Sequence, residues 1–385
     1  MPKILYLVPN LADPAVARRI DMLRLGGAEM DVAGFRRADT EVPKLDADAY
    51  VEIDQTFDAR FGQRLVATMR ARGSMRQWTG GLGRPDIIMA RNLEMLFLAN
   101  RLKAHWSNQP AIVYECLDIH RLMLRGDAIG IAMRSAERHW ARQAEMLITS
   151  SPAFMRNYFD VHGAPPAMIV ENKVLGSGLE RGCNPALGAD TTGPIRIGWF
   201  GALRCSQSLE ALGGLAEAMN GHVEVILRGR PARTEFTDFD AAVAKSPFLH
   251  FEGAYRNPQD LPAIYSGVHL AWAIDFFEQG LNSQWLLPNR IYEGCLNGAI
   301  PIAVAGTETA AFIERLGIGI VLPDIKPTTL HDMIGMLTPD RLRQLAQAVA
   351  DLDARLFACG ADECRQIVER LSTLSPSRLK SVEAA

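Results

Sequence analysis

The stretch Gly280–Gly306, GLNSQWLLPNRIYEGCLNGAIPIAVAG, predicts a helix, a turn and a buried strand in immediate succession. Pro288 suits the first position of the helix because its missing N–H needs no partner there, and Asn297-Gly298 supply a left-handed stop. The apolar run Ile300–Val304 follows as a strand. A helix joined closely to a buried strand is typical of a parallel α/β sheet.

The same alternation of strand and helix extends along the chain on both sides of this stretch. Strand candidates in the first half run from Ile4–Val8 to Met168–Val170, and helical patterns such as Pro14–Leu25 separate them. Residues 171–194 break the pattern with Gly, Pro and small polar residues, and a new strand starts at Ile195–Phe200. The fold class is therefore α/β, with two doubly wound parallel sheets.

The domain boundaries follow from these changes of pattern. We expect a first domain over residues 1–175, a linker over 176–194, a second domain over 195–358, and a terminal helix with a tail over 359–385. A chain of 385 residues with 48% hydrophobic residues exceeds what one core usually fills, which agrees with two domains.

Composition and motifs exclude several classes of function. The net charge of −3 argues against a generally basic nucleic-acid binder. The sequence has no GxxxxGK[ST] loop, no HExxH and no CxxC pair, so we expect neither a Walker-type site nor a metal centre, and no cofactor. The six cysteines read as reduced thiols. No signal-peptide core and no apolar run of transmembrane length is present, so we expect a cytoplasmic protein.

Candidate ligand-binding residues follow the strands, because ligands of open α/β sheets bind beyond the carboxyl ends of the strands. In the second half, Gly201 and Arg204 follow one strand, and Arg228 follows the next. Glycine allows close approach to the backbone, and arginine together with a helix N-terminus attracts a diphosphate. Ordinary turns with solvated arginines would give the same pattern. Glu293 adds a carboxylate on the helix of the opening stretch, where it could also be a surface charge.

In the first half, the strand Ala111–Cys116 ends in Leu117-Asp118-Ile119-His120. A carboxylate and an imidazole therefore emerge together at a ligand-facing edge, and Asp118 could accept the proton of a reacting hydroxyl. The alternative is that Asp118 caps the next helix while His120 packs on a neighbour. Glu94 and Glu171 also follow strands and are further candidates for binding the same substrate.

The order of Gly201-Ala202-Leu203-Arg204, Arg228 and PNRIYEG resembles the donor domain of GT-B glycosyltransferases over residues 195–323. It is also similar to the bacterial exopolysaccharide glycosyltransferases of the succinoglycan type. The phrases ARNLEML, ITSSPAF and IVEN extend the likeness through the first half. The resemblance implies a GT-B fold, with two Rossmann-like domains facing a cleft and a last helix that crosses back to the first domain.

The resemblance also implies roles for the candidate residues. Glu293 would hold the ribose of a sugar nucleotide, and the donor site would comprise Gly201, Arg204, Arg228, Asn282, Gln284, Asn289 and Glu293. Asp118 and His120 would be catalytic, and Glu94 and Glu171 would bind the acceptor; no metal is implied. Trp285 stands where many members carry an earlier Glu, and Ser206-Gln207-Ser208 stand where many carry a Lys. The choice between an inverting and a retaining reaction therefore stays open.

The expected function is transfer of a sugar from a nucleotide-diphosphate sugar to a lipid-linked saccharide in surface or exopolysaccharide synthesis. Two alternatives remain from the residues alone. One is an epimerase or hydrolase of nucleotide sugars on the same scaffold, and the other is a non-catalytic subunit that binds a sugar nucleotide.

A basic segment points to a further partner. Six arginines and no acidic residue lie between Asp58 and Asp86: Arg60, Arg64, Arg70, Arg72, Arg76 and Arg84. We expect this Arg60–Arg84 segment to contact anionic lipid, as a peripheral protein at the inner face of the cell membrane would. The apolar residues of the same helix, Phe61, Leu65 and Met69, could instead pack on the sheet.

Overall fold

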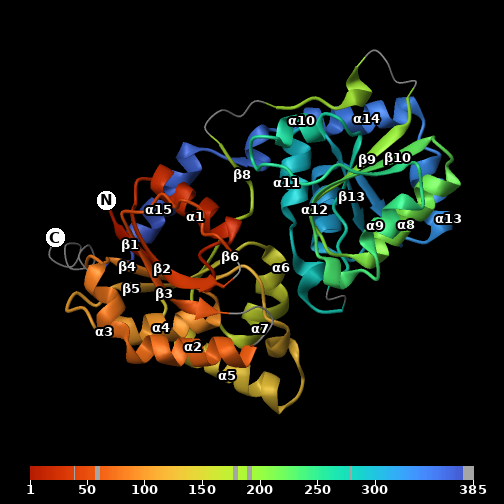
Figure 1. Cartoon of the computed structure of the whole chain (residues 1–385). Coiled ribbons are helices and arrows are strands. Elements are labelled where there is room, and N and C mark those ends of the chain that lie inside the picture. Colours follow the sequence, from red (N-terminus) through yellow and green to blue (C-terminus); the bar gives the residue numbers. More distant parts are fainter. Residues whose placement is uncertain (39, 57–60, 177–180, 189–192, 278–279, 376–385) are drawn as a thin grey trace. The chain divides into compact units, whose positions relative to one another are not determined.

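The computed structural model describes the chain except residues 39, 57–60, 177–180, 189–192, 278–279 and 376–385, and it gives the backbone alone for 61–65. The chain forms two compact units (Figure 1). The first comprises Met1–Val170 with Gly360–Ala385, and the second comprises Glu171–Cys359. Each contains its own parallel sheet, as the alternation of strands and helices predicts.

The sheet of the first unit has seven strands in the order β3-β2-β1-β4-β5-β6-β7, and neighbouring strands pair in parallel. The order reverses between β1 and β4, and such a switch point is where ligands bind in open α/β sheets. The strands are β1 (Lys3–Val8), β2 (Glu29–Arg37), β3 (Ala49–Thr56), β4 (Ile87–Arg91), β5 (Ala111–Cys116), β6 (Met146–Thr149) and β7 (Ala167–Ile169).

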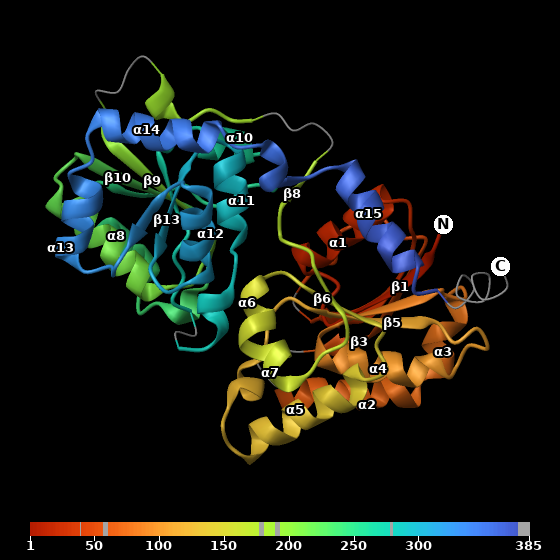
Figure 2. The same cartoon turned by 180° about the vertical axis from the view of Figure 1, so that it is seen from behind.

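Helices cover both faces of this sheet. In Figures 1 and 2, α2, α4 and α5 lie on one face, and α1 and α15 lie on the other. Gly26 allows α15 to approach closely, because a β-carbon there would stand 2.3 Å from the Cys364 carbonyl oxygen. The helices are α1 (Pro14–Leu25), α2 (Phe61–Gly73), α3 (Met75–Trp78), α4 (Asn92–Lys103), α5 (Ala128–Ala141), α6 (Pro152–Phe154), α7 (Asp160–His162) and α15 (Ala361–Ser372).

A buried ion network joins the central strands of the first unit to α1. Glu115 in β5 is fully buried, and its two carboxylate oxygens accept hydrogen bonds from Arg19 Nε and Arg91 Nε, each at 2.7 Å. The Tyr6 hydroxyl of β1 donates to the same carboxylate. Arg91 also reaches Asp13, which caps the first turn of α1, at 3.3 Å. The network therefore fixes four elements around one carboxylate.

The sheet of the second unit has six parallel strands in the order β11-β10-β9-β12-β13-β14, and its switch point lies between β9 and β12. Trp199 and Trp272 are the largest side chains of its core. The strands are β9 (Ile195–Leu203), β10 (Val223–Pro231), β11 (Leu249–Phe251), β12 (Leu270–Trp272), β13 (Ile300–Val304) and β14 (Ile320–Leu322).

Helices α8, α9 and α13 cover one face of this sheet, and α10, α11 and α12 cover the other (Figures 1 and 2). The helix of the opening stretch, α11, begins at Asn289, so Pro288 is its N-cap and not its first residue. Gly298 has the expected positive φ of 85°. The bounds are α8 (Ser206–Ala218), α9 (Phe239–Ala244), α10 (Leu261–Tyr265), α11 (Asn289–Leu296), α12 (Glu308–Leu316), α13 (Pro327–Leu330) and α14 (Pro339–Ala350).

Two details of the second sheet differ from the sequence-based expectation. Gly201 and Arg228, which were expected to follow their strands, lie within them, because β9 and β10 stay paired as far as Leu203 and Pro231. Gly229 makes this possible, since its φ is 132° and a β-carbon there would stand 1.9 Å from the Gly201 carbonyl oxygen. The longer strand leaves Cys205 as the N-cap of α8, where its Sγ accepts from Ser208 N.

The chain passes from the first unit to the second at residue 171, five residues before the predicted linker. The reason is a two-stranded parallel sheet, in which β8 (Val174–Leu175) pairs with β15 (Ala358–Cys359). The two apolar residues of β8, Val174 and Leu175, therefore belong to the second unit. Among the residues with described structure, no helix combines the length and the apolar content needed to cross a bilayer.

Removing the charge of Glu115 is expected to destabilise the protein strongly. Glu115→Gln leaves Arg19 and Arg91 buried without their carboxylate, which costs about 3–5 kcal/mol for a buried pair. Denaturant unfolding at neutral pH measures this loss. Glu52→Gln is the matched control, because Glu52 pairs with Arg36 on a more exposed strand and should cost less than about 1 kcal/mol. Equal effects of the two substitutions would contradict the role of the network.

The same carboxylate predicts a pH dependence. Burial alone would raise the pKa of Glu115, but Arg91 and Arg19 outweigh it and lower the pKa from 4.5 to about 2. Because the folded-state pKa lies below the unfolded value, the contribution is complete above pH 4.5 and is lost as pH falls towards 2. The wild type should lose more unfolding free energy over this interval than Glu115→Gln does.

Candidate functional site

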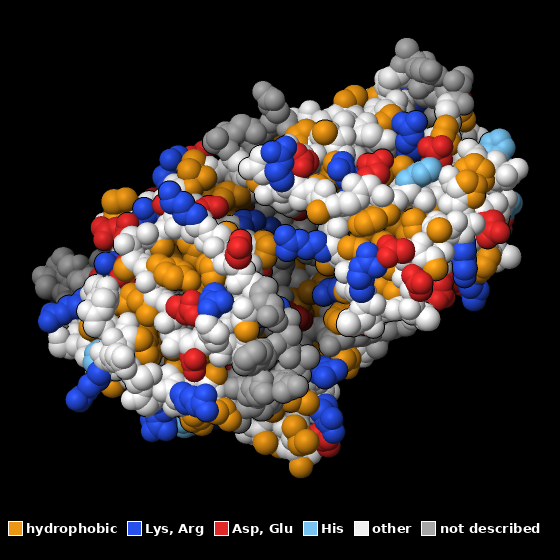
Figure 3. Space-filling model, viewed as in Figure 1, with side chains coloured by type: hydrophobic (Ala, Val, Ile, Leu, Met, Phe, Trp, Pro, Cys, Tyr) orange, Lys and Arg blue, Asp and Glu red, His pale blue; other side chains and the backbone are white. Residues whose placement is uncertain are grey.

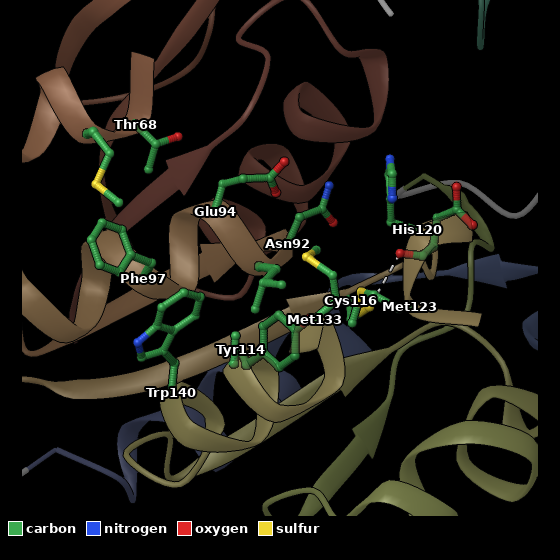
Figure 4. Close-up of a pocket in the computed structure, with 14 residues that line it drawn as sticks. Thr68, Asn92, Glu94, Phe97, Tyr114, Cys116, His120, Met123, Met133 and Trp140 are labelled. Atoms are coloured by element: carbon green, nitrogen blue, oxygen red, sulfur yellow. Dashed lines mark hydrogen bonds between the residues drawn. The ribbon is translucent and has the colours of Figure 1, made fainter. Parts of the chain in front are cut away.

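A pocket of about 230 Å³ opens in the first unit between α2, α4 and α5, beside the ends of β4 and β5 (Figure 4). One end is apolar, where the rings of Phe97 and Trp140 pack with their centroids 5.0 Å apart. The other end is polar, with Asn92, Glu94 and His120. The complete lining is Thr68, Met69, Asn92, Leu93, Glu94, Phe97, Tyr114, Cys116, Asp118, His120, Met123, Met133, Ala136 and Trp140.

The polar end is built from two chain segments that leave neighbouring strands. Asn92 begins α4 directly after Arg91, with a φ of 68° that non-glycine residues rarely adopt. Backbone strain of this kind clusters at functional sites, where the surrounding structure maintains it. Here the ion pair of the preceding residue, Arg91, with Glu115 holds the backbone in place. Glu94 lies in the first turn of α4, where a carboxylate is favoured by the helix dipole.

The second segment follows β5. The Cys116 thiol donates to the Asp118 carbonyl oxygen at 3.4 Å, and His120 Nδ1 accepts from Leu122 N at 3.3 Å. Asp118 is exposed and His120 is half-buried. His120 caps the short helix at 121–124 and Asp127 caps α5, so the helix caps that follow β5 do not include Asp118.

A buried carboxyl group supports the wall of the pocket. Glu137 of α5 accepts a hydrogen bond from the Tyr114 hydroxyl at 2.7 Å and another from the Tyr158 hydroxyl at 2.6 Å. Burial raises the pKa of Glu137, and the two tyrosine hydroxyls only partly oppose this. The arrangement holds the ring of Tyr114 towards the pocket while its hydroxyl points to Glu137.

The structure brings together three of the four residues predicted for the first half. Asp118, His120 and Glu94 line one pocket although they come from two different connections. Glu171 is the first residue of the second unit and is not part of the lining of this pocket. The sequence did not predict the aromatic and methionine side chains of the pocket, because apolar residues on helices are typical of ordinary core positions.

The second unit has a cluster of polar residues at the carboxyl ends of β9 and β12. Asp275 Oδ2 lies 3.2 Å from Arg204 Nε and 3.5 Å from an Arg290 guanidinium nitrogen. The Arg204 guanidinium also stands over the Phe277 ring, 4.5 Å from its centroid. Arg204 is therefore held in place rather than mobile, and one carboxylate is shared between two cations. Glu278 lies outside the described residues.

Glu293 of α11 lies in the same region and is buried. Its Oε1 accepts from Asn257 Nδ2 at 2.7 Å, and its Oε2 accepts from the Tyr265 hydroxyl at 3.3 Å. Burial and the Glu293 charge raise the pKa of the neighbouring Tyr255, whereas Arg290 opposes this. The Tyr255 hydroxyl stands 3.8 Å from where a β-carbon of Gly201 would lie, so the cluster reaches β9.

The other predicted residues of the second unit occupy different environments. Arg228 Nε lies 3.7 Å from Glu252, so it too has an acidic neighbour. Asn282 is buried in the short helix at 282–285, whereas Gln284 and Asn289 are exposed. Arg290, the residue after Asn289, points inward and was missed, as were Asn257, Tyr255 and Tyr265.

The chemistry of this cluster suits an anionic, hydroxyl-bearing ligand. Arg204 and Arg290 offer guanidinium groups, which pair with phosphate oxygens, and Glu293 offers a carboxylate, which accepts from hydroxyls. Within the part of the chain that the structure describes, no group of three or more His, Cys, Asp or Glu residues could hold a metal ion.

Comparison with solved structures defines the class of protein. The chain is similar to sucrose-phosphate synthase from Thermosynechococcus elongatus, with a TM-score of 0.69 and 13% identity, over 97% of this chain and 98% of that one. It is also similar to Anabaena Alr3699/HepE in complex with UDP, with a TM-score of 0.59 and 13% identity, over the whole of both chains. Two parallel Rossmann-like sheets with these likenesses define a GT-B fold.

Sequence comparison then gives the family. No family model matches the chain. The chain is 48% identical over 381 residues to the succinoglycan biosynthesis protein ExoL of Rhizobium meliloti (strain 1021), which covers 97% of this chain and 94% of that protein. The chain therefore belongs to the family of that ExoL protein, and the resemblance inferred from PNRIYEG and its neighbouring motifs is confirmed.

Proposed function

We propose that this protein is a GT-B glycosyltransferase that transfers a sugar from a nucleoside diphosphate sugar to a saccharide in exopolysaccharide synthesis. Membership of the ExoL family supports this function, and the similar HepE structure holds UDP. The observation that carries the proposal is the buried carboxylate of Glu293 beside the Arg204–Asp275–Arg290 cluster. It is the arrangement that a ribose joined to a diphosphate requires.

In the donor site, Glu293 accepts hydrogen bonds from ribose hydroxyls, and Asn257 and Tyr265 orient its carboxylate. Gly201 lets the diphosphate approach the backbone of β9, and Arg204, Arg228 and Arg290 supply positive charge. As the bond to the sugar breaks, charge grows on the leaving diphosphate, and fixed cations stabilise it most at that point. No metal or cofactor is needed for this step.

In the acceptor site, a saccharide hydroxyl binds at the polar end of the first-unit pocket. Its oxygen attacks the anomeric carbon, the carbon–oxygen bond to the diphosphate breaks, and the nucleoside diphosphate leaves with the electron pair. Asp118 accepts the proton of the hydroxyl, and His120 and Glu94 orient the acceptor. Glu171 is assigned to the same substrate on the resemblance alone. In a retaining reaction Asp118 would orient the acceptor sugar instead.

Glu293→Gln is expected to weaken UDP binding. The substitution removes the charge from a contact to the ribose, and such a charge-assisted hydrogen bond is worth roughly 1.5–3 kcal/mol. Calorimetry with UDP measures the affinity, and Glu314→Gln on the exposed face of α12 is the control. Unchanged affinity in Glu293→Gln would contradict the ribose role. Failure of the wild type to bind UDP would contradict UDP as the nucleotide.

Asp118→Asn is expected to reduce transfer by roughly 10²–10⁴-fold and to leave UDP affinity unchanged, because a general base acts on the acceptor and not on the nucleotide. The assay follows labelled sugar from a UDP-sugar mixture into organic-extractable product. Asp160→Asn is the control, since Asp160 is another exposed aspartate of the first unit. Full activity in Asp118→Asn would remove Asp118 from the reaction.

We also propose that the first unit contacts anionic lipid at the inner face of the membrane. On α2, Val66, Met69, Arg70 and Arg72 are exposed, so cationic and apolar side chains border one another, and Arg76 is exposed on the following helix α3. Met69 is 48% exposed, whereas Ala67 and Ala71 of the same helix are buried; the side chains of Phe61 and Leu65, the other apolar residues of this helix, lie outside the described residues. Arg60 lies outside the described residues, as does the Arg64 side chain.

Exposed apolar side chains also occur at the start of α5. Ile129 and Ile131 are 51% and 55% exposed. Figure 3 shows hydrophobic side chains with both cationic and acidic neighbours at that end of the unit. Exposed isoleucines beside arginines suit the boundary between lipid headgroups and acyl chains.

Replacing Arg70, Arg72 and Arg76 with Gln should release the protein from anionic vesicles in a flotation assay, because each arginine near such a surface contributes on the order of 1 kcal/mol. UDP affinity should stay unchanged. The control replaces Arg341, Arg343 and Arg355, three exposed arginines of the second unit, with Gln. If the wild type does not float with phosphatidylserine-containing vesicles at low salt, the membrane contact is wrong.

A further inference from the structure

One carboxylate lies between two of the arginines assigned to the diphosphate. Asp275 Oδ2 stands 3.2 Å from Arg204 Nε and 3.5 Å from an Arg290 guanidinium nitrogen. The Asp275 side chain is 13% exposed and that of Arg290 is 10% exposed, so solvent screens these charges less than it would at the surface. The three side chains together therefore present one net positive charge to a ligand, although two of them are cations.

Several contacts hold Asp275 in this position. Its Oδ1 accepts a hydrogen bond from the Phe277 N–H at 2.9 Å, while its Oδ2 faces the arginines. Arg204 is in turn fixed over the Phe277 ring, and Arg290 donates to the Trp272 carbonyl oxygen at 3.3 Å. Rotation of the carboxylate would break its contacts with the backbone and with both arginines. The negative charge therefore stays beside any diphosphate that binds the two arginines.

Sugar transfer changes the charge of the ligand in this site. The diphosphate of a sugar nucleotide is esterified at both ends, by the nucleoside and by the sugar. When the bond between the anomeric carbon and the terminal phosphate oxygen breaks, the electron pair stays on that oxygen. The released nucleoside diphosphate then carries about one more negative charge than the donor at neutral pH. Fixed cations alone would hold this product more tightly than the donor, and slow product release would limit turnover.

We propose that Asp275 makes the donor site discriminate between sugar nucleotide and product. Its fixed negative charge opposes the additional charge of the nucleoside diphosphate and so promotes release of this product. The inference rests on the proposed function, since it adds a specificity-determining residue to the donor site. Asp275 acts through its charge and takes no part in making or breaking bonds.

Calorimetry with UDP and with the methyl ester of its terminal phosphate tests this at about pH 7.5, where that phosphate of UDP is ionised. The ester has the charge of a sugar nucleotide and lacks the sugar. Asp275→Asn removes the negative charge and keeps an oxygen for the Phe277 N–H. We expect UDP affinity to rise at least about fivefold relative to ester affinity, since a charge pair about 4 Å apart has an effect of this size even in water. Asp275→Glu should keep the wild-type ratio.

Asp240→Asn is the matched control, because Asp240 of α9 pairs with Arg233 and both side chains are more than half exposed. This substitution should change neither affinity. If Asp275→Asn does not fold, Asp275→Ser removes the same charge and retains a hydroxyl oxygen for the Phe277 N–H. In the transfer assay, UDP should inhibit Asp275→Asn at least about fivefold more strongly than it inhibits the wild type, because the same charge is missing.

Two results would overturn the inference alone. Unchanged affinities in Asp275→Asn would show that the charge does not reach the ligand, and an equal change in both would show that Asp275 only holds the arginines in place. If the wild type binds neither UDP nor its ester, the ratio is measured with the nucleoside diphosphate that raises the melting temperature most and with the methyl ester of that compound. Binding of no nucleoside diphosphate would contradict the proposed function together with the inference.

Discussion

The carboxylate of Glu115 is the interaction on which the first unit depends. It is fully buried, and it stays charged because two guanidinium groups and a tyrosine hydroxyl surround it. Burying one charge alone would cost several kcal/mol, so the three elements that supply its partners cannot separate without a large penalty. The network therefore sets how β1, β4, β5 and α1 meet.

This constraint reaches the pocket through Arg91. Its guanidinium is fixed by Glu115 and Asp13, and the next residue is the strained Asn92. Asn92 starts α4, which carries Glu94 and Phe97 to the two ends of the pocket. A single buried ion network thus positions a polar and an apolar group of the site.

The second unit is organised differently from the first. In place of a central buried ion pair, it has two strands whose backbones come close together at glycines and two arginines that share one carboxylate. Gly201 and Gly229 let β9 and β10 stay paired beyond the predicted strand ends, which carries the region of Arg204 further from the core. Asp275 then holds Arg204 and Arg290, and Glu293 is held by Asn257 and Tyr265. Side chains fixed before a ligand arrives lose less entropy when it binds.

The sequence predicted most of the architecture because apolar runs with clear stops define their own elements. The helix Pro14–Leu25 and the strands Ala111–Cys116 and Ile300–Val304 have the expected bounds. The extension of β9 was not predictable, since Gly-Ala-Leu reads as a turn until its pairing with β10 is known. Asn257 was not predicted for a similar reason. It lies 36 residues from its partner Glu293, and no local sequence pattern indicates a contact over that separation. The three pocket residues were found because parallel strands end at one edge.

Mass spectrometry of products tests the central claim most directly. The protein is incubated with a mixture of UDP-sugars and a lipid extract from cells that make exopolysaccharide. The account predicts that one lipid-linked saccharide gains the mass of a single glycosyl residue, with an equal amount of UDP released. An isomerised sugar nucleotide or a free sugar, with no gain in any acceptor, would indicate an epimerase or a hydrolase and would contradict the account.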